Sequence, residues 1–251
     1  MMNILRGATY VVRGYGLITR PGLRRFVVAP LLVNMLVFAS LLWLGIDQFG
    51  NLTDLLLPPG ESWWAVLARF ALWLLFAAAA LLIIIFTFTL LANLVAAPFN
   101  GLLSEKVEEQ VTGARPRRGP GGLRASVAGI IPSLVNELRK LIYFLLWGGV
   151  LFLLSLVPVL NALSPFLWMA FTSWMLAVEY LSYPMENNGL TFNDVRKRVT
   201  ERRAASLGFG FAVLCAMMIP FVNFLVMPAA VAGATAFWAD EWRDRRDNNA
   251  A

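Results

Sequence analysis

Long uninterrupted apolar runs dominate the chain, and their lengths predict membrane-spanning helices. The run Phe26 to Ile46 contains no charged residue, and neither does the run Phe70 to Phe99. At about 1.5 Å per helical residue the two runs extend about 30 Å and about 45 Å, so each can cross the hydrocarbon core of a bilayer. The second run is longer than a perpendicular span needs, and we expect it to tilt or to continue into water.

Two later apolar blocks are interrupted near their middle. The block Leu141–Tyr183 contains one charged residue, Glu179, and is broken at Pro158, whereas the block Ala204–Ala239 contains none and is broken at Pro220. Each arm has about 16 to 18 residues, at or just below the length of a full span. We expect two helical hairpins whose tips either stop inside the membrane, against protein or a water-filled cavity, or are tight loops between full spans.

Shorter helices are predicted outside these runs. Apolar residues at helical spacing near the start of the chain predict an amphipathic helix on the cytoplasmic face of the membrane, with its apolar stripe formed by Ile4, Ala8, Val11, Tyr15 and Ile18. Thr191 and Asp194 form a capping-box pattern that starts a basic helix extending to Arg203. The segment Gly119–Gly122 indicates a flexible break.

These elements predict a single all-α integral membrane domain with two long transmembrane helices, two membrane-embedded hairpins and amphipathic cytoplasmic helices. The expected segments are an amphipathic start at 1–25, long helices at 26–46 and 63–99, a cytoplasmic segment at 100–140, hairpins at 141–183 and 204–240, a basic helix at 190–203 and a cytoplasmic tail at 241–251.

Composition supports a membrane protein and excludes other classes. Apolar residues make up 59% of the 251 residues and charged residues 14%, whereas soluble domains are about half apolar and about a quarter charged. The chain has no His and one Cys, which excludes an internal disulfide, a His-based metal site and a Ser-His or Cys-His triad. With no convincing Ser-Lys or Asp-Asp pair either, we expect no catalytic residues, no metal and no cofactor.

The distribution of basic residues predicts the orientation in the membrane. Every Lys and Arg except Arg69 lies before Phe26, in 106–140, in 196–203 or after Trp242, while the connection between the first two long helices is acidic. The positive-inside rule then places both termini in the cytoplasm and makes both hairpins enter from that side. Basic clusters at membrane edges account for the net charge of +6, so no nucleic-acid partner is expected.

The stretch 19–26 is the strongest candidate binding motif. We expect Pro21 just inside a helix start, which leaves free backbone N–H groups from Gly22 to Arg25. Gly22 allows a ligand to approach the backbone, and Arg24 and Arg25 can donate charge-assisted hydrogen bonds to a tetrahedral oxyanion. The motif predicts a sulfate or phosphate site at the cytoplasmic mouth; alternatively, both arginines only anchor the helix at the lipid headgroups.

Polar residues embedded in apolar helix predict a polar pathway. Amides can hydrogen-bond a partly dehydrated anion without holding it too tightly, although each could instead cap a broken helix or join helices. Glu179 is expected to form a salt bridge, and Glu105 either pairs with an arginine or carries a proton. The sequence 158–161 recurs as Pro-x-x-Asn at 220–223, which is typical of transport sites. The candidate asparagines are Asn34, Asn93, Asn100, Asn161 and Asn223.

Several strings together resemble the CysZ family of bacterial sulfate permeases over nearly the whole chain. They are Pro-Gly-Leu-Arg-Arg-Phe at 21–26 with Pro-Leu-Leu-Val-Asn at 30–34, Ala-Ala-Pro-Phe-Asn-Gly-Leu-Leu at 96–103, Trp-Met-Leu-Ala at 174–177, and Gly-Ala-Thr-Ala at 233–236. The resemblance implies an oligomeric inner-membrane protein that imports sulfate for cysteine synthesis. It also implies a Gly-Leu-Arg sulfate-binding motif at Gly22, Leu23, Arg24 and Arg25. The implied pathway residues are Asn34, Asn93, Asn100 and Glu105, with Asn161 and Asn223 at the hairpin tips.

The energetics of sulfate import leave two mechanisms open. Moving a dianion against an inside-negative potential of 100 mV costs about 4.6 kcal/mol, a concentration ratio of roughly a thousandfold or more. A channel-like facilitator therefore requires very low internal sulfate, whereas proton symport would remove the penalty and would need a carboxylate such as Glu105. The sequence contains no ATP-binding loop. Sulfite is an expected competitor because of its similar shape. The remaining alternative is a non-transporting membrane scaffold or receptor with a basic cytoplasmic face.

Overall fold

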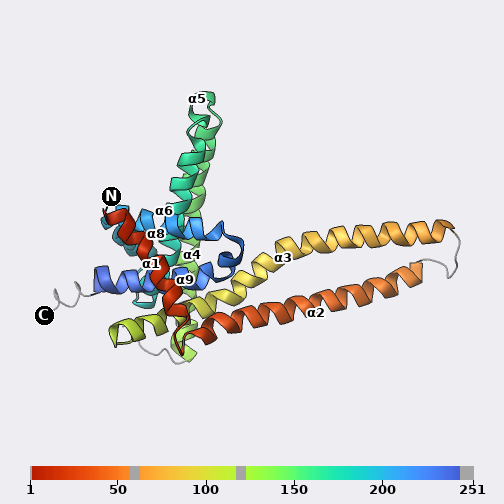
Figure 1. The fold of residues 1–251 in the computed structure, drawn as a ribbon, viewed down its shortest axis with the longest axis horizontal. Coiled ribbons are helices and arrows are strands. Elements are labelled where there is room, and N and C mark those ends of the chain that lie inside the picture. The colour runs from red at the N-terminus through yellow and green to blue at the C-terminus, as the bar shows by residue number, and fades with distance from the viewer. Residues whose placement is uncertain (1, 57–62, 117–122, 244–251) are drawn as a thin grey trace. The chain divides into compact units, whose positions relative to one another are not determined.

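The computed structural model describes residues 2–56, 63–116 and 123–243, and the regular elements in these ranges are helices (Figure 1). The predicted all-α class is therefore confirmed, while the predicted break at Gly119–Gly122 lies outside the described residues. In chain order the elements are α1 (Met2–Ile18), α2 (Arg24–Leu56), α3 (Trp63–Thr112), α4 (Leu123–Ser155), α5 (Pro158–Asn161), α6 (Ser164–Asn187), α7 (Phe192–Glu201), α8 (Arg203–Met217), α9 (Pro220–Trp238) and the π-helical turn η1 (Ala239–Arg243).

Internal contacts divide the chain into two compact units, a division that the sequence pattern did not predict. One unit comprises Met1–Val27 with Asn100–Ala251, and the other comprises Val28–Phe99. The division runs through α2 and α3, so each of these helices contributes one end to the larger unit.

The smaller unit is a hairpin of two long antiparallel helices, the greater parts of α2 and α3. Phe49 stacks on Phe76 with ring centroids 4.1 Å apart, and Trp73 packs edge-on against both rings. Most described apolar side chains of this unit are exposed, as Leu36 on α2 and Leu75 on α3 illustrate. Exposed apolar surface on a long helix is the arrangement that a lipid environment favours.

Three helices extend well beyond the apolar runs that predicted them, and the first is α2, which continues past Ile46 to Leu56. α3 continues through Pro98 to Thr112, so the first part of the expected cytoplasmic segment is helical. The reason is that apolar positions continue at helical spacing: Leu103 and Val107 are fully buried in the larger unit. Likewise α4 begins at Leu123, well before the first hairpin was expected to start.

The first hairpin consists of α4 and α6, joined by the short helix α5. α4 ends at Ser155 and α5 begins at Pro158, which confirms the predicted break. Lys140 on α4 is only 3% exposed, and its Nζ lies 3.0 Å from a carboxylate oxygen of Glu179 and 3.0 Å from one of Glu137. The salt bridge predicted for Glu179 is thus present, and it connects α4 to α6.

The second hairpin consists of α8 and α9 and is more deeply buried. α8 ends at Met217 and α9 begins at Pro220, again at the predicted break. Every residue of α9 from Ala229 to Trp238 is buried, as is typical of a helix that is apolar on all sides. Small residues permit this packing: a Cβ at Gly210 of α8 would overlap the carbonyl oxygen of Ser173 in α6.

Helix α1 packs against both arms of the second hairpin. Gly7 and Gly208 lie where α1 meets α8, and Gly14 and Gly233 lie where α1 meets α9. A Cβ at any of these positions would overlap the backbone of the facing helix. The predicted stripe of α1 is only partly correct, because Val11 and Ile18 are buried but Ile4 is 45% exposed. The buried face of α1 contacts protein, and its place on the membrane surface stays a prediction.

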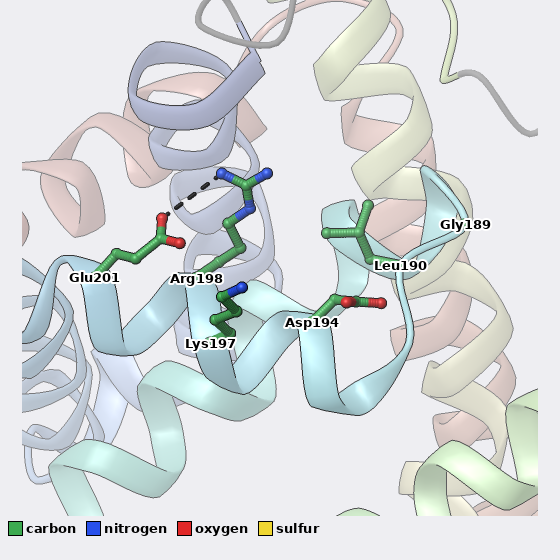
Figure 2. Close-up of a pocket in the computed structure, with 6 residues that line it drawn as sticks. All are labelled: Gly189, Leu190, Asp194, Lys197, Arg198 and Glu201. Atoms are coloured by element: carbon green, nitrogen blue, oxygen red, sulfur yellow. Dashed lines mark ion pairs between the residues drawn. The ribbon is translucent and has the colours of Figure 1, made fainter.

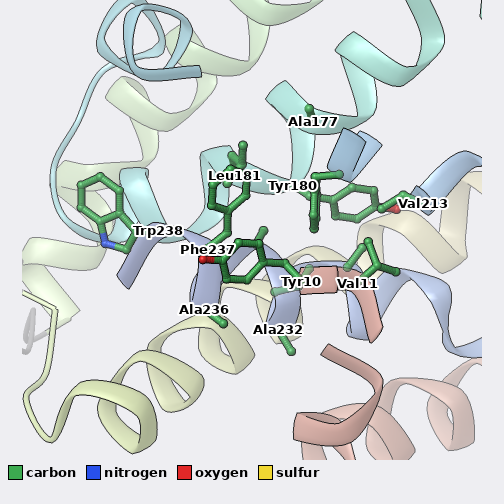
Figure 3. Close-up of a cluster of buried hydrophobic side chains, with 14 of the residues drawn as sticks. Tyr10, Val11, Ala177, Tyr180, Leu181, Val213, Ala232, Ala236, Phe237 and Trp238 are labelled. Carbon is green, nitrogen blue, oxygen red and sulfur yellow. The ribbon is translucent and has the colours of Figure 1, made fainter. Parts of the chain in front are cut away.

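Aromatic rings complete the core around α9 (Figure 3). Tyr10 of α1 stacks on Phe237, with ring centroids 4.6 Å apart. Beyond these rings, η1 is held by ion pairs from Arg6 and Arg202 to Glu241, at 2.6 Å and 3.1 Å. Stacked rings and ion pairs therefore join the first and last described helices of the larger unit.

Helix α7 connects the two hairpins and begins at the predicted capping-box residues. The Thr191 backbone N–H donates to Asp194 Oδ2 over 2.9 Å, and the Thr191 hydroxyl donates to the same oxygen over 2.6 Å. The predicted helix start is confirmed. The helix ends at Glu201 rather than at Arg203, so the basic stretch is divided between α7 and α8.

Within the described residues, three helical segments are long and apolar enough to cross a membrane: Arg24–Asn51, Val135–Ser155 and Pro220–Trp242. Shorter apolar helical stretches lie at Val66–Leu82 and Arg203–Met217. The chain is thus a membrane protein by the length and composition of its helices, as the sequence predicts.

Candidate anion-binding site

The predicted anion motif forms a tight turn between α1 and α2. The Leu23 backbone N–H donates to the carbonyl oxygen of Arg20 over 3.2 Å, and Gly22 has a positive φ of 88°. Pro21 followed by a residue with positive φ defines a type II turn, and Gly22 is the residue that adopts this conformation without strain.

This turn corrects the prediction that Pro21 lies just inside the helix. α2 begins at Arg24, so Pro21 precedes the helix. The N–H of Leu23 is already used to close the turn and is therefore not free for a ligand. The chemistry expected of the motif has to come from its side chains and from the remaining backbone groups.

The Leu23 side chain anchors the turn. It is fully buried in the apolar cluster of the larger unit, together with Leu17, Val27, Leu103 and Val107. The residues on either side of Leu23, by contrast, are exposed. Burial of one apolar side chain therefore fixes the backbone while it leaves the polar groups accessible to solvent.

The two arginines of the motif extend from this fixed turn with their charges available. Arg24 Nε donates to the carbonyl oxygen of Thr19 over 2.6 Å, and the Arg25 guanidinium lies 4.9 Å from the centre of the Phe26 ring. Neither arginine forms an ion pair with any residue that the structure describes. Because no described carboxylate neutralises their charges, both can attract an anion.

Gln110, near the end of α3, also contacts the turn and was missed in the sequence. Its Nε2 donates to the carbonyl oxygen of Pro21 over 3.3 Å, although the two residues are 89 positions apart. No local pattern predicts a contact across such a separation. The one indication in the sequence is that Leu103, Val107 and Gln110 are spaced so that they share one face of a helix.

Two of the predicted polar residues lie on the end of α3, and they differ in their exposure to solvent. Asn100 is buried and lies next to Tyr183, whereas Glu105 is exposed. The buried carboxylate on this helix is Glu108, which accepts hydrogen bonds from Asn188 Nδ2 at 2.9 and 3.0 Å. The helical spacing of Ser104, Val107, Glu108 and Val111 could have indicated this.

Two other pathway candidates belong to the smaller unit. Asn34 lies on α2 and is partly buried. Asn93 lies on α3, where the structure describes the backbone but not the side chain. The helical placement of both residues is consistent with their prediction, and their part in a pathway stays a prediction.

Asn161 and Asn223 lie at the tips of the first and second hairpin, and both are exposed. In Figure 1, α5 and the start of α9 stand well apart, so the structure does not bring these two amides together. Their shared feature is the backbone: the N–H of Asn161 donates to Val157 and that of Asn223 to Ile219, each over 2.9 Å. The Pro-x-x-Asn sequence therefore begins a helix at both of its occurrences.

Comparison with known proteins decides the family. The model of the family described as "Sulfate transporter CysZ/Etoposide-induced protein 2.4" matches residues 10–228. The chain belongs to this CysZ family. It is 44% identical to a protein named "Sulfate transporter CysZ" from Pseudomonas aeruginosa, over 97% of this chain and 98% of the relative. A protein of the same name from Vibrio parahaemolyticus is 40% identical over 96% of both chains.

The resemblance predicted from the sequence is therefore confirmed for this CysZ-family chain. The matched range includes every predicted site residue, from Gly22 to Asn223. The range also contains Gln110 and Glu108, which sequence reasoning passed over.

An open pocket of this CysZ-family chain lies elsewhere, at the junction of α6 and α7 (Figure 2). Its charged lining residues are two acids and two bases, and Arg198 is 3.6 Å from Glu201. This balance of charge gives no preference for an anion, and no predicted site residue lines the pocket. Its lining residues are Gly189, Leu190, Asp194, Lys197, Arg198 and Glu201.

Proposed function

We propose that this chain is a sulfate permease that acts as a channel-like facilitator in the inner membrane of a bacterium and supplies sulfate for cysteine synthesis. Relatives that align with it over almost their whole length are named sulfate transporters. Its helices include segments long enough to cross a membrane. The proposal assigns substrate binding to the Gly22–Arg25 turn.

The observation that supports this assignment most strongly is the combination of a fixed backbone and two arginines that form no ion pair with a described residue. Leu23 is buried, so the turn has a defined conformation, while Arg24 and Arg25 are exposed beside the start of a long apolar helix. A cation pair at this position raises the local concentration of a dianion. Guanidinium groups also match the geometry of sulfate oxygens.

The helix lengths favour a pathway that is partly formed by incomplete spans. α8 has 15 residues and extends about 22 Å, which is less than the hydrocarbon core of about 30 Å, whereas α6 has 24 residues and extends about 36 Å. We propose that the second hairpin stops within the membrane and that six polar side chains contribute to the pathway: Asn34, Asn93, Asn100, Glu105, Asn161 and Asn223.

Facilitated movement is favoured over proton symport by the environment of the candidate carboxylate. Glu105, which we considered as a proton carrier, is exposed. A carboxylate that couples proton movement to transport would be enclosed along the transport route, and the exposed position of Glu105 does not provide that enclosure. Import then depends on the cell keeping its internal sulfate low, since the membrane potential opposes entry of a dianion.

Further parts of the proposal concern orientation and partners. The basic residues support cytoplasmic termini. The exposed apolar side chains of α2 and α4 support contact with lipid and with a second copy of the chain, hence a homo-oligomer. Sulfite, which presents a similar set of oxygens, would compete with sulfate at the same turn.

The decisive experiment measures uptake of radiolabelled sulfate into liposomes containing the purified protein at a clamped voltage, with and without a pH gradient. The double variant Arg24→Ala/Arg25→Ala is compared with Lys197→Ala/Arg203→Ala, which removes the same charge from exposed residues of α7 and α8. We expect uptake that ignores the pH gradient and falls at least about tenfold in the first variant only. Loss of two charge-assisted hydrogen bonds corresponds to at least that factor.

Other outcomes would replace the proposal. Faster uptake with an inward proton gradient would indicate symport and direct attention to Glu105. Equal loss in both double variants would show that general positive charge matters rather than the turn. No uptake above that of empty liposomes, by protein shown to be folded, would favour the scaffold or receptor alternative.

A further inference from the structure

We propose that Gln110 is a positioning residue of the anion site: its side-chain amide holds the Pro21–Gly22 turn in shape and presents an N–H group beside Gly22. The inference rests on the proposed function, because it names a further determinant of the same site. It assigns to the end of α3 a part in substrate affinity that the sequence motif itself does not contain.

The first argument is the contact itself. Gln110 Nε2 donates to the carbonyl oxygen of Pro21 over 3.3 Å. That carbonyl belongs to the peptide group between Pro21 and Gly22, the central peptide of the type II turn. A hydrogen bond to this group restrains the rotation that would convert the turn into another type. The amide therefore acts where the conformation of the motif is decided.

The second argument is the space beside Gly22. A Cβ placed on Gly22 would have one neighbour within 4 Å outside the adjoining residues, and that neighbour is Gln110 Nε2 at 3.6 Å. The open face of the glycine is therefore bordered by an amide nitrogen with a second N–H to donate. An oxyanion that approaches the glycine backbone meets a neutral donor there, which adds affinity without adding charge.

The third argument is how Gln110 is held and what surrounds it. Val107, one turn earlier on α3, is fully buried in the same cluster as Leu23, so the helix and the turn are packed together. The neighbouring carboxylate, Glu109, is occupied by Lys106 at 2.6 Å and Arg115 at 3.2 Å. These hydrogen bonds lower the pKa of Glu109, and the two cations offset the negative charge that would otherwise repel an anion.

The test compares three substitutions of Gln110 in proteoliposomes. Gln110→Ala removes the donor, Gln110→Glu replaces it with a charged acceptor of the same shape, and Gln110→Lys keeps a donor. Both the half-saturating sulfate concentration and the maximal uptake are measured, together with binding of radiolabelled sulfate to the purified protein. Gln48→Glu, the same chemical change at an exposed position on α2, is the matched control.

We expect Gln110→Ala to raise the half-saturating concentration about fivefold, the effect of one lost hydrogen bond, and Gln110→Glu to raise it more than about tenfold because it also adds repulsion. Gln110→Lys keeps a donor and adds a positive charge, so its half-saturating concentration should be no higher than that of the wild type, and maximal uptake should change little in all three. The binding constants should follow the same order, and Gln48→Glu should match the wild type.

Three results would overturn the inference. One is a wild-type half-saturating concentration in both Gln110→Ala and Gln110→Glu. Another is a fall in maximal uptake alone, in parallel with lower thermal stability, which would indicate a merely structural residue. The third is a Lys variant that behaves like the Ala variant. If the Arg24/Arg25 double variant loses uptake while the Gln110 variants do not, only this inference fails; if wild-type protein carries no sulfate, the proposed function fails with it.

Discussion

At the tips of the two hairpins an extended apolar residue is followed by a proline that opens the next helix. Val157 and Ile219 have similar backbone angles, with φ of −80° and −94° and ψ of 120° and 112°. Each accepts a hydrogen bond from the N–H of an asparagine four residues later, Asn161 and Asn223 respectively. The same short sequence thus produces the same turn twice.

Below their tips the hairpins differ. α4 of the first hairpin exposes large apolar side chains, such as Leu145 and Leu146, each 65% exposed, while α9 of the second is enclosed by its neighbours. A buried lysine with two carboxylates joins α4 to α6, whereas glycines bring α8 and α9 against α1 and α6. The difference shows that the local sequence determines the turn at the tip. The size of the side chains along each helix determines how closely that helix packs against its neighbours.

The largest difference in stability between the two hairpins is expected when a glycine is replaced by a larger residue. Gly210→Leu in α8 places a side chain against the backbone of Ser173, which cannot move aside, so we expect a loss of at least about 3 kcal/mol or failure to fold. Gly149→Leu in α4 is the control, since a Cβ there meets nothing within 4 Å, and helix propensity makes it neutral or slightly stabilising. Thermal unfolding in detergent measures the stability of both variants. Equal stability would contradict the conclusion that α8 is closely packed where α4 is not.

Removing the buried Lys140 ammonium tests whether its ion pair with Glu179 holds α4 and α6 together. Lys140→Met leaves Glu179 without its cation inside the α4–α6 pair, and we expect a loss of about 2 kcal/mol, moderated because Glu179 is partly exposed. Arg139→Met, at the adjacent exposed position without an ion pair to any described residue, should stay within about 0.5 kcal/mol. The readout is again thermal unfolding, and an undisturbed Lys140→Met protein would contradict the role given to this ion pair.

The helix that connects the hairpins depends on Asp194. We expect Asp194→Ala to cost about 1 kcal/mol, as is usual for lost helix caps, and Asn193→Ala to cost little. Hydrogen bonds from the Thr191 hydroxyl and N–H lower the pKa of Asp194 below its ordinary value of 3.8. The stabilisation is therefore complete above that value and is lost as the pH falls through the lowered pKa. Unfolding curves of wild type and variant should converge in acid, and a constant difference would contradict this.

The smallest effect on stability is expected at the tips. Asn161→Ala and Asn223→Ala change exposed side chains and leave the backbone hydrogen bonds intact, so each should alter stability by less than about 0.5 kcal/mol. If these amides contribute to the pathway, sulfate uptake should fall severalfold in both. Unchanged uptake in both variants would remove the tips from the proposed pathway.

Much of the candidate site could be read from the chain, since Gly22, Arg24 and Arg25 form one short motif and the side chains that bear its charge are exposed. The details of the turn could not. Pro21 is equally compatible with the first turn of a helix and with position two of a type II turn, and only the hydrogen bond from Leu23 to Arg20 separates the two. The exposure of Glu105 and the burial of Glu108 could not be read from the chain either, because they depend on which face of the end of α3 packs inside the larger unit.

The sequence by itself determined the helical class, the breaks at Pro158 and Pro220 and the helix start at Thr191, because these depend on residues close together in the chain. Tertiary structure decided the rest. The burial of α9, the division into two units and the approach of Gln110 to Pro21 all join residues far apart in sequence. Such contacts depend on how whole helix faces fit together, a property of the packed chain that no short segment carries.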